Sequence, residues 1–388
     1  MARDESLDLD RARQRFEEST DFTVAIEEEF AIVDPATLEL THRFEELREA
    51  AAADETLADS VRGELIDTEI EIRSGRAESF ADAVEQQREV RRRLFALAAE
   101  REAGLVATGT HPWADYRDQH IIDTPHYQQL QRDLGWVAQR NNTWSLHVHV
   151  GVNGADRAIA VCDRLRSTLP TLLAVSANSP FLDGLDTGLH SVRTQIFTRM
   201  FPRCGVHQPF GDWATYARFV ELLERTNSVI ESTQLWWSVR PHHSFGTVEV
   251  RICDAQTRGE ESLQLAGLLY ACVAQAATDF DEGRLPVPEP DRNVEENLWR
   301  AIRYGMEGRM VDFEAGREIE AAEAVERLLA WTAPARESLG VDGVPQGPNG
   351  AQRARAALAD GATLGEVYRD ALEETMRTYG ADRAPAVS

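Results

Sequence analysis

Hydrophobic and polar residues alternate in four segments of the chain, and this alternation predicts four β-strands. The segments are FTVAIEEEFAIV at residues 22–33, ELIDTEIEIR at 64–73, WSLHVHVGV at 144–152 and TVEVRI at 247–252. A fifth stretch, LVATGTHP at 105–112, predicts a strand that runs into a loop. Turn-forming residues follow the first two segments directly, as expected at strand ends.

Longer segments with apolar residues at helical spacing predict helices between and after these strands. The clearest is residues 77–103, an amphipathic helix rich in Arg and Glu that we expect to lie across a face of the sheet. Further helices are predicted at 44–59, 155–177, 211–232, 260–280, 292–307, 319–332 and 364–378. Because strands and helices do not follow a strict β–α–β order, the pattern favours an α+β fold with an antiparallel or mixed sheet.

The polar side chains of each predicted strand share one face. Alternate residues of a strand point to the same side, so Glu27 and Glu29 project together and Glu28 points away. The same rule groups Asp67 with Glu69 and Glu71, His147 with His149, and Glu249 with Arg251. If these strands lie in one sheet, a single face carries carboxylates, imidazoles and an arginine, which indicates a multi-metal nucleotide site. The alternative is a set of half-buried strands whose polar residues face solvent.

The charge of the chain disfavours several partners. Its 388 residues include 66 acidic and 41 basic residues, a net charge of −25 that repels nucleic acid phosphates and anionic lipids. We therefore expect neither nucleic acid nor a membrane as a partner. No apolar run approaches the roughly 20 residues of a membrane span, and residues 1–20 lack the apolar core of a signal peptide, so the expected location is the cytoplasm. The acidity suits either an ordinary cytosolic enzyme or a salt-rich habitat.

All 41 basic residues are arginine. Without lysine, the chain cannot use Schiff-base catalysis or the lysine of a Walker-type phosphate loop. Any ATP must therefore be held by metal ions, arginines and backbone amides. The cysteines form no C-x-x-C pair and have no zinc-ligand spacing, so neither a zinc site nor a disulfide framework is expected.

Five longer motifs occur in order: AIEEEFAIVDPATLEL at 25–40, TGTHP at 108–112, LHVHVGV at 146–152, SANSPFLDGLDTGLHSVR at 176–193 and VRPHHSFGTVEVRICD at 239–254. Together they resemble the glutamate–cysteine ligase type 2 family of ATP-dependent carboxylate–amine ligases. The resemblance implies a glutamine synthetase-like catalytic domain, in which a curved, mostly antiparallel sheet has helices on its convex side and binds ATP and Mg²⁺ on its concave face. One departure is ENLWRAIRYG at 296–305, which lacks a basic residue expected within that pattern.

The resemblance also implies roles for individual residues. The implied metal ligands are Glu27, Glu29, Glu64, Glu71, His147 and Glu249. Arg251 is the implied stabiliser of the transferring phosphoryl group, with Glu249 as the second catalytic residue. The implied substrate-binding residues are Arg193, Thr110, His111 and His149. Glu64 precedes Glu71 by an odd number of residues, so the two cannot share a face of an unbroken strand.

By resemblance, the reaction joins a carboxylate, with glutamate suggested, to an amine through an acyl phosphate. Cysteine is one candidate acceptor, and another amino acid or amine is the alternative. A metal-dependent hydrolase, which would work without ATP, and a non-catalytic nucleotide sensor remain alternatives from other classes. The implied organisation is a single ligase catalytic domain at 21–378, between an acidic, Arg-rich segment at 1–20 and a flexible tail at 379–388, with a homodimer expected.

Overall fold

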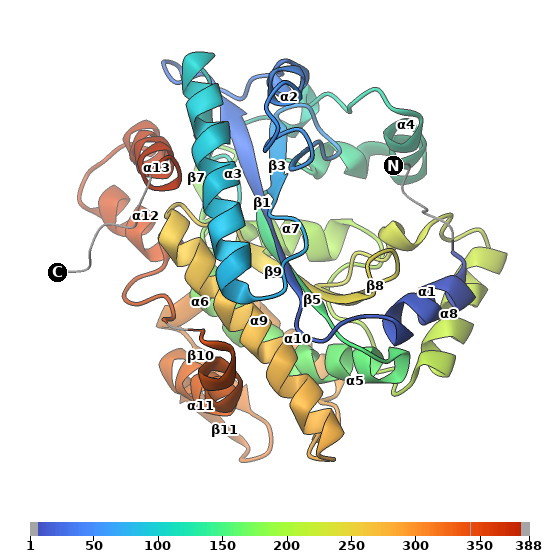
Figure 1. Ribbon diagram of the computed structural model, residues 1–388. Helices are drawn as coiled ribbons and strands as arrows, with labels where there is room; N and C mark the ends of the chain where they lie inside the picture. Colours follow the sequence, from blue (N-terminus) through green and yellow to red (C-terminus); the bar gives the residue numbers. More distant parts are fainter. Residues whose placement is uncertain (1–6, 342, 382–388) are drawn as a thin grey trace.

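A seven-stranded sheet organises the computed structural model, which describes residues 7–341 and 343–381 (Figure 1). Its strands are β1 Val24–Val33, β2 Val61–Arg62, β3 Glu69–Arg73, β4 Gly104–Val106, β5 Ser145–Gly151, β8 Val239–His242 and β9 Thr247–Asp254. They follow the order β2-β3-β1-β5-β9-β8, with β4 also on β1, and every pairing is antiparallel. β2 and β8 form the two ends, so the sheet stays open. The predicted α+β fold with a mostly antiparallel sheet is confirmed.

Helices cover one face of this sheet. Figure 1 shows α3 (Phe80–Glu100) and α9 (Gly259–Asp281) lying across it, and α5 (Ala155–Leu165) and α6 (Leu169–Ser176) contact the same strands. Every second side chain of a strand points toward these helices, and Val148 of β5 is fully buried there. Burial of this apolar face is the main favourable contribution to the fold.

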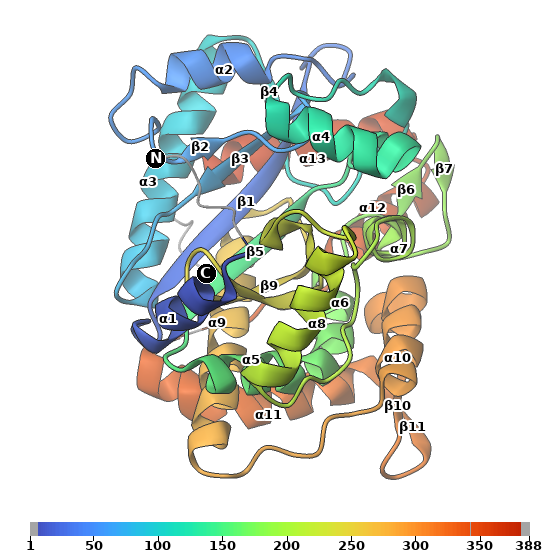
Figure 2. The same ribbon diagram turned by 90° about the vertical axis from the view of Figure 1, so that its right-hand side faces the viewer.

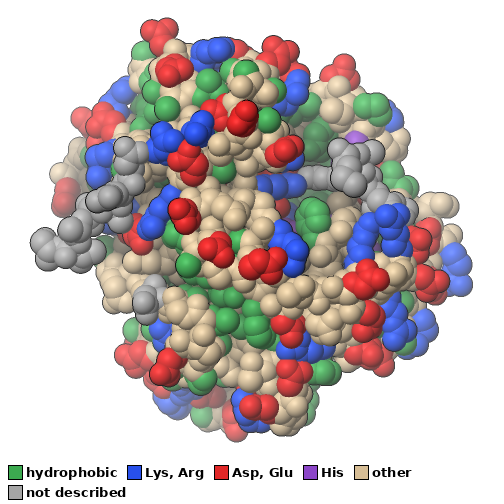
Figure 3. All heavy atoms as spheres, viewed as in Figure 1, with side chains coloured by type: hydrophobic (Ala, Val, Ile, Leu, Met, Phe, Trp, Pro, Cys, Tyr) green, Lys and Arg blue, Asp and Glu red, His purple; other side chains and the backbone are tan. Residues whose placement is uncertain are grey.

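The remaining elements surround the sheet. The helices are α1 Leu9–Glu17, α2 Phe44–Ala51, α4 Pro125–Leu134, α7 Val192–Met200, α8 Trp213–Arg225, α10 Asp291–Tyr304, α11 Ala321–Leu339, α12 Gly350–Ala359 and α13 Leu364–Tyr379. Two short hairpins pair β6 Phe181–Leu182 with β7 Leu185–Asp186 and β10 Arg309–Asp312 with β11 Arg317–Glu320. Among the described residues no helix is long and apolar enough to span a membrane. Acidic side chains and arginines are interspersed over the face drawn in Figure 3.

Some predicted elements have different bounds in the structure. The helix expected at 155–177 is divided into α5 and α6, because Pro170 at the start of α6 lacks the amide hydrogen that an unbroken helix requires. The strand expected at 64–73 is regular only from Glu69, after a turn at residues 67–68. Helices α2 and α8 are shorter than predicted, and the pattern did not predict α1, α4, α7, α12 or β8.

Both ends of the described chain pack on the sheet and its helices. Phe16 of α1 is fully buried, and its ring centroid lies 5.6 Å from that of Trp213. The N-terminal helix is therefore part of the folded unit. Tyr379, the last residue of α13, is also buried, and its hydroxyl donates a hydrogen bond to a backbone carbonyl. The tail predicted at 379–388 thus starts with a packed residue; residues 1–6 and 382–388 lie outside the described residues.

Candidate active site

Polar side chains from five neighbouring strands meet in one pocket, on the sheet face opposite α3 and α9. Figure 2 shows α4 and α7 on this side of the sheet. The strands contribute Glu69, Glu71 and Arg73 from β3, Glu27 and Glu29 from β1, Ser145, His147 and His149 from β5, Glu249 and Arg251 from β9, and Arg240 and His242 from β8. Glu28 points to the opposite face, where it binds Arg91 of α3. The predicted alternation along β1 is therefore confirmed.

The antiparallel register brings several of these residues into directly opposed cross-strand pairs. The pairs are Glu27 with His147, Glu29 with Glu71, His149 with Glu249, and Arg240 with Glu249. Side chains in such pairs start only about 4.5–5.5 Å apart. Residues from distant parts of the sequence therefore form one polar cluster.

Two overlapping groups of side chains in this pocket could hold divalent cations. One contains Glu27, His147 and Glu249, and the other contains Glu29, Glu71 and His147; the ligand atoms of each group lie within 4.8 Å of one another. His147 joins the groups, with Nδ1 3.5 Å from Glu27 and Nε2 3.7 Å from Glu29. All five side chains are buried. Mg²⁺ prefers carboxylate oxygens, so this donor set fits it better than a thiolate-seeking metal.

The charges of the carboxylates differ between the two ends of the cluster. Burial, reinforced by the neighbouring Glu71, raises the pKa of Glu29 to about 7. Burial also raises the pKa of Glu69 and Glu71 well above the usual range. At Glu27 and Glu249 burial acts in the same direction, but the adjacent arginines hold the pKa of both well below that range. The carboxylates of Glu29, Glu69 and Glu71 must therefore be protonated or be neutralised by a cation. A divalent cation would supply the missing positive charge, and this is the structural argument that one fits here.

Three arginines bind the ionised carboxylates. Arg73 Nε lies 3.0 Å from Glu27, and Arg240 Nε donates to Glu249 at 2.6 Å. Arg251 Nη1 donates to the other carboxylate oxygen of Glu249. Arg73 follows Glu71 at two-residue spacing in the second predicted strand, so the alternation places it on the same face. No pattern in the sequence marked Arg240. Sequence reasoning singled out neither residue.

Other predicted residues also line the pocket. Glu64 lines it although it precedes Glu71 by an odd number of positions, because the chain turns at residues 67–68 and strand parity does not extend across a turn. His149 and Arg193 line it as well. The structure therefore gathers all six implied metal ligands, Arg251 and two of the four implied substrate-binding residues around a single cavity.

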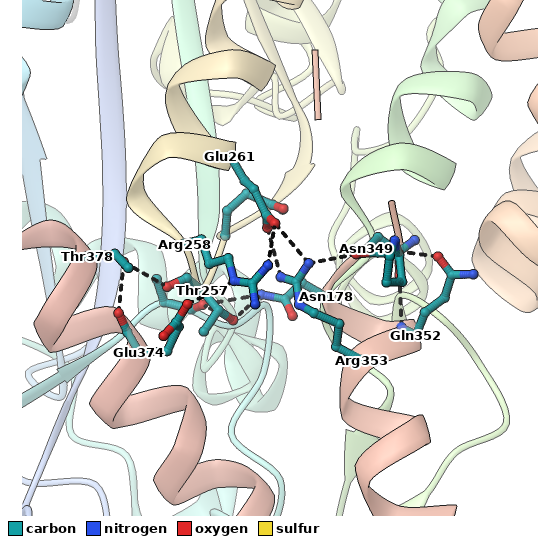
Figure 4. Close-up of polar contacts among 12 residues, drawn as sticks. Asn178, Thr257, Arg258, Glu261, Asn349, Gln352, Arg353, Glu374 and Thr378 are labelled. Carbon is teal, nitrogen blue, oxygen red and sulfur yellow. Dashed lines mark hydrogen bonds and ion pairs between the residues drawn. The ribbon is translucent and has the colours of Figure 1, made fainter. Parts of the chain in front are cut away.

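Thr110 does not line this pocket. Its hydroxyl donates to the backbone carbonyl of Phe181 at 2.9 Å, and it lines a second cavity bounded by α12 and α13. Figure 4 shows polar contacts beside that cavity, where Glu261 binds both Arg258 and Arg353. These contacts attach the C-terminal helices to the start of α9.

His111 is also outside the acidic pocket. Its imidazole is fully buried, with Nε2 2.8 Å from the carbonyl oxygen of Leu38, and its Nδ1 accepts a hydrogen bond from the backbone N–H of Ala114. Burial lowers the pKa of His111 to about 4, so the ring is neutral at neutral pH. The structure thus gives this histidine backbone contacts that shape the loop.

Glu29 should make the metal-free protein less stable as the pH rises. Its pKa is about 7 in the folded state against an ordinary value of 4.5, so between these values the folded protein keeps a proton that the unfolded chain has lost. Stability from this group is therefore present at low pH and is lost as the pH rises through 7. The quantity to compare is the free energy of unfolding of Glu29→Gln minus that of the parent protein, both measured in EDTA. This difference should increase by about 1 kcal/mol from about pH 6 to about pH 8.

Urea unfolding of both proteins at a series of pH values measures this difference. Added Mg²⁺ should reduce it, because a cation offsets the Glu29 charge in the parent alone. A difference that stays constant with pH would contradict the raised pKa. Gln can still accept the 2.6 Å hydrogen bond from the backbone N–H of Ser145, so the substitution removes the charge with little change in packing.

Comparison with known proteins identifies relatives over almost the whole chain. The family model described as glutamate-cysteine ligase family 2 matches residues 23–360. A Rubrobacter xylanophilus protein named “Putative glutamate--cysteine ligase 2-2” is 36% identical over 355 residues, covering 91% of this chain and 91% of its own. A Solibacter usitatus protein named “Putative glutamate--cysteine ligase 2” is 34% identical, covering 91% of this chain and 93% of its own.

Two solved structures share the fold at low sequence identity. The crystal structure of glutamate–cysteine ligase from Francisella tularensis in complex with AMP has a TM-score of 0.67 and 10% identity, covering 95% of this chain and 91% of that chain. A bifunctional glutathione synthetase from Pasteurella multocida has a TM-score of 0.68 and 13% identity, covering 95% of this chain and 54% of that chain. At these identities the likeness concerns the fold.

Proposed function

The chain belongs to glutamate–cysteine ligase family 2, and from this premise we propose that its acidic pocket joins a carboxylate to an amine at the expense of ATP. The observation that carries the proposal is the convergence of buried carboxylates, three imidazoles and arginines from five adjacent strands on one sheet face. The names of the relatives suggest glutamate as the carboxylate substrate.

The proposed ligands for Mg²⁺ are Glu27, Glu29, Glu71, His147 and Glu249, together with Glu64, which also lines the pocket. When bound, Mg²⁺ supplies positive charge to the phosphates of ATP and to the carboxylate. The protein residues fix where that charge is delivered. His149 lies 3.4 Å from Glu27 and 3.8 Å from Glu249 and supports the position of both.

Two buried arginine N–H groups support binding of anionic substrates. Within the described residues, Nε of Arg251 and Nε of Arg193 have no hydrogen-bond partner. An unpaired buried donor is costly, and a substrate oxygen would satisfy it. We assign Arg251 to the transferring phosphoryl group and Arg193 to the second carboxylate of glutamate. Glu249 is proposed to orient Arg251 through their hydrogen bond.

In the proposed first step, a carboxylate oxygen attacks the γ-phosphorus of ATP, the bond from that phosphorus to the bridging oxygen breaks, and ADP leaves. The product is an acyl phosphate. Arg251 offsets charge on the equatorial oxygens during this transfer. In the second step the amine attacks the acyl carbon, and the bond to the phosphate oxygen breaks to give the amide. Neither step needs a covalent bond to the protein.

Trapping with hydroxylamine tests this proposal directly. Hydroxylamine attacks acyl phosphates without a dedicated binding site, so purified protein with MgATP, glutamate and hydroxylamine should release ADP and an equal amount of glutamyl hydroxamate. Both products should disappear in EDTA. If ATP binds but neither product forms, the nucleotide-sensor alternative is favoured. Hydrolysis of a substrate without ATP would favour the hydrolase alternative.

A further inference from the structure

The pocket has a floor and an apolar wall. The charged side chains of the sheet strands form the floor. Most of the wall comes from α4 and from the end of α7, which lie on the pocket side of the sheet (Figure 2). Its members are Leu65, Tyr127, Leu130, Leu134, Phe201 and Trp236. All but Phe201 pack together in one hydrophobic cluster, and Phe201 meets Trp236 edge to face with ring centroids 6.3 Å apart. These apolar and aromatic side chains offer a surface against which an apolar group of a substrate can pack.

One buried carboxylate belongs to this wall. Glu231 is 6% exposed, and one of its oxygens lies 3.3 Å from Nδ1 of His126, a partly exposed residue of α4. Both side chains line the pocket. A buried carboxylate next to apolar and aromatic groups suits an ammonium group that carries a hydrocarbon body.

The arginines of the pocket limit how many substrate carboxylates it can bind. Of the four arginines that line it, Arg73, Arg240 and Arg251 each bind a glutamate of the sheet floor. Arg193 instead donates to backbone carbonyls and lies 3.5 Å from Asp254, which is outside the pocket lining. Among these described lining residues, Arg193 is therefore the one arginine that does not bind a glutamate of the floor. Glutamate already needs this cation for its second carboxylate.

An amino acid acceptor would bring a further carboxylate into a region that already holds Glu231 and Glu64. Like charges in a buried site repel strongly, and no second arginine of the described lining remains to offset them. We infer that the acceptor is a primary amine with an apolar or aromatic body and no carboxylate, bound between the wall and Glu231. This inference rests on the proposed function, since it names the second substrate of that reaction.

Glu231 also accounts for one of the two protons that the ammonium must lose. It accepts the first proton, and the nitrogen lone pair then forms the bond to the acyl carbon as the carbon–oxygen bond to phosphate breaks. The second proton leaves the nitrogen with the departing phosphate, which becomes hydrogen phosphate. The products are the amide and inorganic phosphate, and Glu231 returns its proton to solvent.

Phenethylamine and phenylalanine test the inference, because they differ only by the α-carboxylate. With MgATP and glutamate, kcat/KM for the amide of phenethylamine should exceed the value for phenylalanine, and that for cysteine, by about tenfold or more. Mass spectrometry of the amides measures this ratio, and hydroxamate formation in parallel reports the acyl phosphate. The inference is wrong if hydroxamate forms but phenylalanine or cysteine couples at least as well as phenethylamine. Absence of hydroxamate would instead refute the proposed function.

Glu231→Gln tests the assigned role of the carboxylate. The ratio of phenethylamine amide to hydroxamate should fall by about tenfold or more, because hydroxylamine needs neither the ammonium contact nor proton removal at this position. Glu224→Gln removes an exposed carboxylate of neighbouring α8 and should leave the ratio unchanged. If amide and hydroxamate fall together in Glu231→Gln, the residue acts on the whole site and its role toward the amine is overturned.

Discussion

Replacing Glu249 by Gln is expected to lower kcat/KM for ADP formation by about a thousandfold or more. Glu249 is 1% exposed and accepts hydrogen bonds from Arg240 and Arg251 through its two oxygens. Gln keeps the shape of the side chain but removes the negative charge. The change would leave two guanidinium groups without their anionic partner and one proposed metal group without a carboxylate.

Steady-state release of ADP in the hydroxylamine assay measures this loss. A thermal melt of each protein separates a catalytic defect from unfolding. Glu221→Gln, an exposed carboxylate on α8, makes the same chemical change away from the pocket and should keep the activity of the parent. If Glu249→Gln stays folded and retains activity within about tenfold of the parent, Glu249 lies outside the catalytic machinery.

The second large effect concerns stability, and it arises on the side of β1 that faces the helices. Glu28 and Arg91 form an ion pair whose two side chains are each 3% exposed. Arg91 Nε donates to Glu28 at 2.6 Å and its Nη1 donates to the carbonyl of Gly259 at 2.9 Å. Arg91→Met should destabilise the fold by about 3–5 kcal/mol, because a buried carboxylate loses its cation.

Urea unfolding of Arg91→Met measures this cost. Arg88→Met is the matched control, since Arg88 lies on the same helix but pairs with Glu260 at the surface, where removal of the partner should cost less than about 1 kcal/mol. The double variant Glu28→Gln with Arg91→Met should recover part of the loss, because no buried charge then remains. Equal losses in Arg91→Met and Arg88→Met would contradict the expected difference between a buried and a surface pair.

The buried pair also bears on the site. β1 has Glu27 and Glu29 on the pocket face and Glu28 on the helix face. Ser262 of α9 and Gln87 of α3 donate hydrogen bonds to Glu28 as well, so two helices hold this strand in one register. A slip by one residue would exchange the faces of all three glutamates.

Much of the site could be predicted from the sequence, because side-chain direction in a strand is a local property. The segments at 22–33, 144–152 and 247–252 contained the strands with the expected faces. The residues predicted to share a face line one pocket: Glu27, Glu29, His147, His149, Glu249 and Arg251. The two-residue alternation failed in the segment at 64–73, because only its second half, from Glu69, is a strand. Asp67, grouped with Glu71 by parity, instead lies in a turn with its carboxylate 2.6 Å from His42.

What the sequence determined by itself was the two-residue alternation of each strand and, through its motifs, the family. Only the tertiary structure decided which strands are neighbours, and thereby that Glu29 faces Glu71 and that Arg240 binds Glu249. It also placed the apolar wall and Glu231 in the same pocket as the proposed metal ligands. The physical reason is that alternation depends on adjacent backbone geometry, whereas these contacts join residues far apart in the chain and follow from how the whole sheet and its helices bury their apolar surface.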